Sequence, residues 1–274
     1  MRRIVSADNA RYKTLLKLAH SSRERRKAGL SLLDGLHLIT AYREHVGIPE
    51  EVAISAAAFE RREIQGLLKA IQPREVLVLT DALFGALSTV ETPTGVVAAI
   101  KTPRPPSIPG EIGSCVMLED IQDPGNLGSI LRSAAAAGIK QVFLSKGSVH
   151  AWSPRVLRAG MGAHFILQIF EQAALLALAH GFNGRVIATA QHAKKTIFGV
   201  DLTGRVALLL GNEGAGLSPA LAAAAHDIVA VPMPGKIESL NVAAAAAVCM
   251  FERVRQLQDG AQSPAINDQP GNKR

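Results

Sequence analysis

Five short, largely apolar runs in the second half of the chain constrain its fold more than any other feature. The runs are Ser114–Leu118, Val142–Leu144, Arg185–Thr189, Val206–Leu210 and Ile228–Val231. Between them lie segments with helical spacing, of which the longest are predicted as helices over Leu127–Ala137, with Gly138 as the C′ residue, and over Leu240–Gln258. Strands that are apolar on both sides are typical of a parallel sheet covered by helices on both faces.

The first hundred residues contain the same kinds of element on a smaller scale. Residues 8–27 place apolar side chains among basic ones, which predicts one amphipathic helix, and a second helix is expected around Ala57–Ala70. The expected strands are Leu30–Leu33, Val52–Ser55, Val76–Leu79 and Val96–Ile100. Their alternation with helices indicates a small α/β domain.

A proline-rich segment separates these two regions. Pro103, Pro105, Pro106, Pro109 and Gly110 all lie within eight residues, which breaks any regular structure. A chain of 274 residues is long enough for two domains with separate cores. We therefore predict a first domain over residues 1–105, a second over 106–258, and a polar, disordered tail over 259–274.

The positive charge of the chain is concentrated at its start. Residues 1–27 hold nine lysines and arginines against Asp8 and Glu24, whereas the remaining residues carry equal numbers of basic and acidic side chains. Such a patch on a neutral body favours a polyanionic partner that docks near the N-terminus. The alternative is that these residues form only the solvated face of an amphipathic helix.

Several classes of protein are disfavoured by composition. Cys115 and Cys249 both lie in apolar surroundings, which is typical of reduced core cysteines. The eight histidines show no metal-ligand spacing, so no metal site is predicted. We find no signal-peptide pattern and no apolar run of membrane-spanning length, so a cytoplasmic protein without a membrane partner is expected.

Three blocks in the second half place glycine and polar residues directly beside apolar runs. They are Asn126–Arg132 (NLGSILR), Gly211–Leu217 (GNEGAGL), and Pro232–Gly235 (PMPG) with Ser239–Asn241 (SLN). Loops of this kind bring backbone amides and a few side chains to a ligand at the ends of strands. Three such blocks indicate one composite site.

Each block also has an ordinary structural explanation. Asn126 is a plausible N-cap, and Gly128 would leave space beside Arg132 on the same helix face. Arg132 suits a phosphate or carboxylate, or it is simply an exposed arginine. Ser239 could be the N-cap of the last helix, whereas capping alone explains Asn241 less well.

The glycine spacing of the second block excludes two nucleotide-binding motifs. The order in Gly211–Gly216 is neither the G-x-G-x-x-G of dinucleotide folds nor a phosphate-binding P-loop. A dinucleotide-dependent oxidoreductase is therefore disfavoured.

Together the ordered motifs N-x-G-x-x-x-R, G-N-E-G-x-G-L and P-M-x-G-x-x-x-S-L-N resemble the SpoU (TrmH-type) ribose 2′-O-methyltransferases of the SPOUT superfamily. The resemblance spans residues 114–257 and includes Leu118–Asn126, Ser153–Ala159 and Gly162. Residues Asn9, Lys13, Leu18, Arg25 and Leu33–Gly35 resemble an RNA-binding domain, similar to a ribosomal protein, that precedes the catalytic domain in many members. This resemblance implies a parallel sheet with a C-terminal trefoil knot.

The resemblance also implies a cofactor, S-adenosylmethionine (AdoMet), and roles for specific residues. The implied cofactor pocket is lined by Leu210, Gly211, Val231, Met233 and Leu240. The implied polar, catalytic side comprises Asn126, Arg132, Glu213, Ser239 and Asn241. A homodimer is implied as well, with the alanines of residues 243–247 near its interface.

The implied reaction is methylation of a ribose 2′-hydroxyl in structured RNA, most simply 23S ribosomal RNA. Family proposals make Arg132 the base, but a guanidinium stays protonated at neutral pH, so orienting RNA phosphate and stabilising alkoxide charge is the alternative role. Transfer RNA remains an alternative substrate, and a non-catalytic RNA-binding protein on the same fold is the alternative class.

Overall fold

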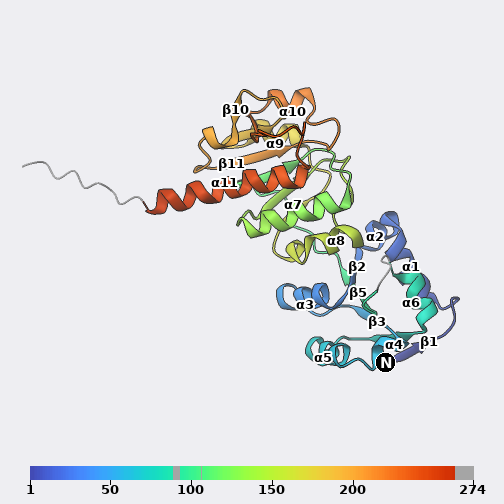
Figure 1. The fold of residues 1–274 in the computed structure, drawn as a ribbon. Helices are drawn as coiled ribbons and strands as arrows, with labels where there is room; N and C mark the ends of the chain where they lie inside the picture. The colour runs from blue at the N-terminus through green and yellow to red at the C-terminus, as the bar shows by residue number, and fades with distance from the viewer. Residues whose placement is uncertain (89–92, 106, 263–274) are drawn as a thin grey trace, which may run out of the picture.

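Two sheets form the protein, one on each side of the proline-rich segment (Figure 1). The computed structural model describes residues 1–88, 93–105 and 107–262, and for residues 261 and 262 the backbone only. The α/β class predicted for both halves is confirmed. No helix in these described ranges is long and apolar enough to cross a membrane.

The first sheet has five strands in the order β1-β4-β3-β5-β2. Its strands are β1 (Arg2–Ile4), β2 (Leu30–Asp34), β3 (Glu51–Ser55), β4 (Val76–Leu79) and β5 (Val96–Lys101). Strand β5 runs antiparallel to β2 and β3, and the other pairs are parallel. The helices that the described residues form beside this sheet are α1 (Ala10–His20), α2 (Ser22–Ala28), α3 (Leu36–His45), α4 (Ala56–Phe59), α5 (Arg62–Ile71) and α6 (Asp81–Leu87).

The single helix predicted over residues 8–27 was wrong, because Ser21 divides it. Ser21 has extended backbone angles, ends α1, and caps α2 by accepting a hydrogen bond from the Glu24 amide. Arg25 is buried and donates to the carbonyls of Leu18 and Ala19. One of the nine basic residues is therefore part of the fold and faces away from any partner. The helix expected around Ala57–Ala70 is likewise divided, into α4 and α5.

The second sheet has seven strands, all parallel, in the order β10-β12-β9-β11-β6-β7-β8. Its strands are β6 (Cys115–Leu118), β7 (Gln141–Leu144), β8 (Gln168–Phe170), β9 (Arg185–Thr189), β10 (Lys195–Thr196), β11 (Val206–Leu210) and β12 (Asp227–Ala230). The helices are α7 (Pro124–Ala136), α8 (Pro154–Gly160), α9 (Leu175–Gly181), α10 (Pro219–Ala223) and α11 (Val242–Gln262), with 3-10 turns η1 (Ala163–Phe165) and η2 (Ile197–Gly199).

Helices cover both faces of this sheet, as predicted. Val116 and Leu118 of β6 belong to a core shared with α7 and α11, whereas Met117 faces the core shared with α9 and α10. Cys115 and Cys249 are buried on opposite faces and unpaired, and burial raises the pKa of each thiol to about 12. The prediction of core cysteines is confirmed.

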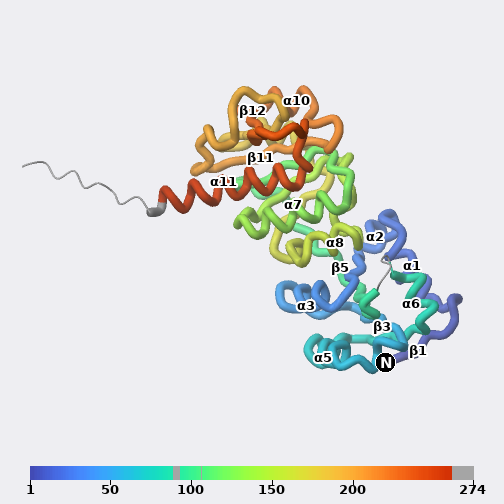
Figure 2. The backbone as a smooth tube through the Cα atoms, in the orientation of Figure 1, coloured from blue at the N-terminus to red at the C-terminus, as the bar shows by residue number. Residues whose placement is uncertain are grey.

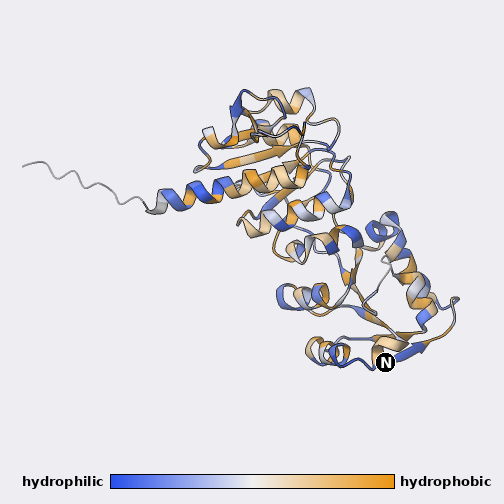
Figure 3. Cartoon of the chain, viewed as in Figure 1, coloured by the Kyte–Doolittle hydropathy of each residue, from blue (hydrophilic) through white to orange (hydrophobic). Residues whose placement is uncertain are grey.

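Helix α11 extends further than predicted. It runs to Gln262, so the predicted tail does not begin at residue 259, and residues 263–274 lie outside the described chain. Figure 2 shows α11 passing along α7, and Figure 3 shows it changing from hydrophobic at its start to hydrophilic towards its end. The change is expected because only its first part packs on the sheet.

The segment from α8 to η1 joins the two halves of the protein. Helix α8 packs against β2, and the ring of Phe165 meets that of Tyr42 in α3 edge-on at 5.4 Å. His37 Nε2 lies 3.4 Å from the carbonyl oxygen of Met161. The apolar core of α7 and α8 is therefore continuous with that of the first sheet.

Candidate active site at the carboxyl edge of the parallel sheet

An open pocket of about 780 Å³ lies beyond the carboxyl ends of β9, β11 and β12. This edge is where parallel sheets commonly bind ligands. The pocket wall includes all five residues expected to hold the cofactor, which are Leu210, Gly211, Val231, Met233 and Leu240, and it also includes Glu213 and Ser239. Residues from two of the sequence blocks thus meet around one space, although thirty positions separate Leu210 from Leu240.

Position 211 requires a glycine because the loop after it folds back against its backbone. The amides of Asn212 and Gly216 each donate to the other residue's carbonyl at 3.0 Å, and Gly216 has a φ of +69°. A Cβ on Gly211 would lie 2.2 Å from the carbonyl carbon of Gly216, so no larger residue fits there. The backbone therefore reaches the pocket directly.

Asn212 holds this loop in place, a role that the sequence did not reveal. Its Oδ1 accepts from the amides of Gly214 and Ala215 at 2.9 Å, and its Nδ2 donates to the carbonyl of Asp120 at 2.8 Å. Glu119 Oε2 accepts from the amide of Ser218 at 2.7 Å. The available signal was an asparagine directly after Gly211 in a glycine-rich segment, which is also common in plain turns.

Glu213, Asn126 and Asn241 form a chain of side-chain hydrogen bonds. Asn241 Nδ2 donates to Asn126 Oδ1 at 2.8 Å, and Asn126 Nδ2 donates to Glu213 Oε1 at 3.1 Å. The carboxylate also accepts from the amides of Gln122 and Asp123, at 3.3 and 3.1 Å. One member of each sequence block is thereby joined to the others.

This arrangement fixes the charge of Glu213. Desolvation alone would raise the pKa of the carboxyl, but the hydrogen bonds from Asn126 and from the backbone amides outweigh it and lower the pKa. Glu213 is therefore an anionic hydrogen-bond acceptor that positions Asn126, which in turn orients Asn241.

Two predicted helix caps were wrong. Asp123, and not Asn126, caps α7 by accepting from the Asn126 amide at 2.7 Å, which leaves the Asn126 side chain free for Glu213. Asn241, and not Ser239, caps α11, because its Oδ1 accepts from the amides of Ala243 and Ala244. Asn241 thus has both a structural and a site role. The expected C′ glycine of α7 is confirmed, since Gly138 has a φ of +74°.

Arg132 is exposed on α7, and none of the described residues forms a hydrogen bond or ion pair with its guanidinium. The idea that Gly128 leaves space beside Arg132 was wrong. A Cβ on Gly128 would lie 2.4 Å from that of Ala159 and 2.7 Å from the Val156 carbonyl oxygen. Gly128 instead permits close packing of α7 on α8. The guanidinium is free to meet a ligand outside the protein.

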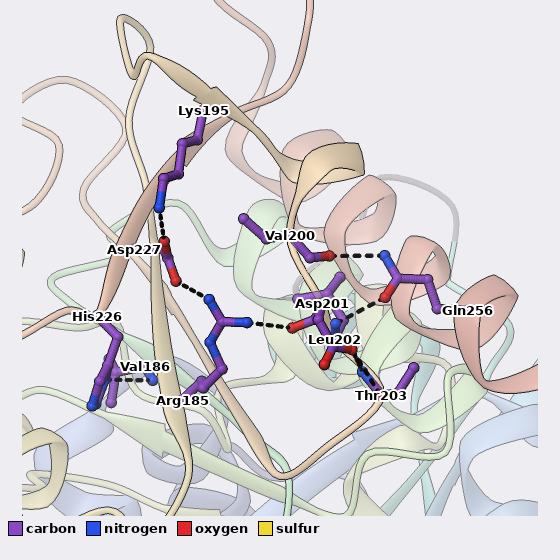
Figure 4. A network of polar contacts seen from close by, with 10 residues as sticks. All are labelled: Arg185, Val186, Lys195, Val200, Asp201, Leu202, Thr203, His226, Asp227 and Gln256. Atoms are coloured by element: carbon purple, nitrogen blue, oxygen red, sulfur yellow. Dashed lines mark hydrogen bonds and ion pairs between the residues drawn. The ribbon is translucent and has the colours of Figure 1, made fainter. Parts of the chain in front are cut away.

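A buried carboxylate, Asp227, fixes another part of the pocket wall. Asp227, only 5% exposed, contacts Arg185 of β9 and accepts from Lys195 Nζ of β10 at 2.5 Å (Figure 4). The bonds from Lys195 and Arg185 lower the pKa of Asp227 despite its desolvation. Arg185 also donates to the Asp201 carbonyl, and Gln256 of α11 bonds to Val200 and Leu202 (Figure 4). Three strands are tied together beside the pocket, a network that the sequence did not predict.

No group of three or more His, Cys, Asp or Glu side chains within the described ranges is placed to hold a metal ion. The described residues of the site offer backbone amides, apolar surface, the side-chain amides of Asn126 and Asn241, the Glu213 carboxylate and the exposed Arg132 guanidinium.

Known proteins resemble this chain in both sequence and fold. The model of the SpoU rRNA Methylase family matches residues 113–251, and that of the MRM3-like substrate binding domain matches residues 9–98. The chain is 31% identical over 253 residues to the 23S rRNA (guanosine(2553)-2′-O)-methyltransferase RlmP of Bacillus subtilis, covering 92% of this chain and 98% of that protein.

Solved structures agree with this result. An RNA 2′-O ribose methyltransferase superposes with a TM-score of 0.81 and 29% identity, covering 93% of this chain and 98% of that one. The SpoU methyltransferase AviRb of Streptomyces viridochromogenes in complex with AdoMet gives a TM-score of 0.78 and 26% identity, covering 92% and 100%. From its motifs, its fold and these matches, the chain belongs to the SpoU rRNA methylase family.

Proposed function

We propose that this protein transfers a methyl group from AdoMet to a ribose 2′-hydroxyl of 23S ribosomal RNA. The observation that carries the proposal is the convergence of three separated blocks. The residues expected to hold the cofactor line one pocket, and the chain Asn241–Asn126–Glu213 borders it. The named activity of the Bacillus subtilis relative supports ribosomal RNA as the substrate.

The pocket fits AdoMet in size and in chemistry. Its volume of about 780 Å³ lies in the range of small-molecule sites. Gly211 brings backbone close to the ligand, while Leu210, Val231 and Met233 supply apolar contacts. AdoMet supplies an electrophilic methyl group on a sulfonium. The protein's part is to place a ribose hydroxyl in line with that methyl group and to exclude competing water.

In this proposal the polar residues orient the acceptor. Asn126 and Asn241 are held by Glu213, and Ser239 lies in the pocket wall nearby. Arg132 binds the RNA phosphate beside the acceptor ribose and stabilises negative charge that develops on the 2′-oxygen. The alternative role of Arg132 is that of the general base that removes the proton of the ribose 2′-hydroxyl.

The remaining expectations complete the proposal. Residues 1–105 bind RNA, and residues 106–258 form the catalytic domain with its trefoil knot. The protein works in the cytoplasm and forms a homodimer. The dimer is supported by an exposed apolar side chain on α11, because Phe251 is 47% exposed. Phe251 lies on the same helix face as Val248, one turn before it, and Ala244, two turns before it. Light scattering after gel filtration tests it, because Phe251→Glu should convert a dimer to a monomer.

Mapping of ribose methylation tests the function directly. We expect one 2′-O-methylated nucleotide of 23S rRNA to be lost in cells without this protein and restored by purified protein with AdoMet. A lost site in transfer RNA would replace the substrate assignment. AdoMet binding without transfer to any cellular RNA would favour the non-catalytic alternative.

The role of Arg132 is tested by Arg132→Lys. Because lysine keeps the charge but loses bidentate geometry, we expect the turnover number to fall about tenfold or more with little change in AdoMet affinity. Turnover close to that of the unaltered protein would contradict any need for the guanidinium.

A further inference from the structure

The short helix α8 carries two arginines that the proposed site does not use. Arg155 and Arg158 are exposed, whereas Val156, Leu157 and Gly160 between and after them are buried. The helix contains no acidic residue that could pair with them along its own face. Two positive charges on seven residues therefore face solvent.

Packing places these arginines between the site and the first domain. Gly128 of α7 contacts Ala159 of α8. Arg132 follows Gly128 by four residues and Arg155 precedes Ala159 by four, so each lies just over one turn, about 6 Å along its helix, from this contact. Each arginine therefore lies beside the seam between the two helices.

Arg158 follows Arg155 by three residues, so the two are neighbours on one face of α8, and Arg158 is the one that lies near the first sheet. Its guanidinium is near enough to Asp34 of β2 to lower the pKa of that carboxyl, although burial raises the pKa more. Both α8 and α2 pack against β2, and α2 carries exposed Arg23 and Lys27. Figure 1 shows α8 between α7 and the first sheet. Exposed basic side chains thus occur on α7, on α8 that packs against it, and on α2 of the first domain.

We propose that Arg155 and Arg158 bind phosphates of the RNA backbone between the methyl-transfer site and the first domain. The inference rests on the proposed function. Exposed guanidiniums suit phosphate oxygens, and such contacts fix the register of an RNA without reading its bases. We call these two arginines the phosphate path. When the first domain holds one part of the RNA, the phosphate path determines which ribose, further along the RNA, reaches Arg132.

Nitrocellulose filter binding with 23S rRNA transcribed in vitro tests the proposal. For the double variant Arg155→Ala, Arg158→Ala we expect the Kd to rise about tenfold near 0.15 M salt. The slope of log affinity against log salt concentration should become shallower by about 1.5, as for two lost phosphate contacts. The KM for RNA should rise in parallel, while AdoMet affinity and turnover at saturating RNA stay unchanged.

Arg205→Ala is the matched control, because Arg205 is also exposed but precedes β11, at the opposite end of that strand from the pocket. It should leave the salt slope unchanged. If the double variant binds RNA with the same salt slope as the unaltered protein, the proposal for Arg155 and Arg158 is wrong, while the proposed function is unaffected. If the unaltered protein neither binds 23S rRNA nor methylates it, the proposed function itself fails.

Protection of the unaltered protein from phenylglyoxal provides a test that needs no variant. Mass spectrometry should show that 23S rRNA shields Arg155 and Arg158 from this arginine reagent and leaves Arg205 reactive. Equal labelling of all three arginines with and without RNA overturns the proposal.

Discussion

Glu213 receives hydrogen bonds from residues about ninety positions earlier in the chain, namely Asn126 and the amides of Gln122 and Asp123. Glu213→Gln keeps the size and shape of the side chain but replaces one carboxylate oxygen with an NH2 group. This group is a hydrogen-bond donor and cannot accept from the donors that now bind the carboxylate. We expect a loss of about 1 kcal/mol in the free energy of unfolding and at least about a tenfold slower methyl transfer. Urea unfolding and initial rates measure the two effects. The exposed Glu111→Gln is the control and should change neither, whereas an unaltered rate for Glu213→Gln would contradict the positioning role.

At the scale of elements, the contact between α7 and α8 sets where Arg132 lies. Gly128→Ala would place a Cβ 2.4 Å from that of Ala159 and 2.9 Å from the Gly160 amide, which must push the helices apart. We expect about 1–3 kcal/mol of destabilisation and reduced methyl transfer. Gly66→Ala in α5 is the control, since nothing lies within 4 Å of its Cβ, and it should stabilise by about 0.5–1 kcal/mol. Thermal unfolding of both variants checks the pair, and a Gly128→Ala protein as stable as the unaltered one would be the contrary result.

At the scale of the whole molecule, His150 lies buried where the two halves meet. Its Nε2 is 3.6 Å from Glu171, which also pairs with Arg26 of α2. Burial, followed by the charges of Arg26 and Arg25, lowers the pKa of His150 to about 3. Below about pH 6.5 the imidazole therefore takes up a proton in the unfolded state but not in the folded state. As the pH is lowered, the free energy of unfolding decreases by about 1.4 kcal/mol for each pH unit.

Replacing this histidine should remove that loss. Between pH 7 and pH 5 we expect the unaltered protein to lose about 2 kcal/mol more than His150→Gln in the free energy of unfolding, measured with urea. The other buried histidine, His164, is present in both proteins and cancels in the comparison. Equal pH dependence of the two proteins would show that His150 is not the titrating group.

Much of the fold was predictable because local pattern and burial agree. The strands Val76–Leu79, Arg185–Thr189 and Val206–Leu210 begin and end as predicted, since each is a buried run bounded by turn residues. Strands β1, β8 and β10 were missed because they have only two or three residues and begin with exposed Arg2, Gln168 and Lys195. Such strands exist only because a neighbouring strand pairs with them.

By itself the sequence determined the parallel sheet and its covered faces, and the resemblance of its motifs named the family and five residues of the pocket wall, because apolar runs and glycine-polar motifs are local properties of the chain. Only the tertiary structure decided which side chain caps a helix and which one faces the site. From the sequence Asn126 was the plausible cap and Asn241 was not, yet Asp123 caps α7 and leaves Asn126 to bond to Glu213, while Asn241 both caps α11 and bonds to Asn126. The partner of a polar side chain depends on segments brought together from distant parts of the chain, and no local pattern records that.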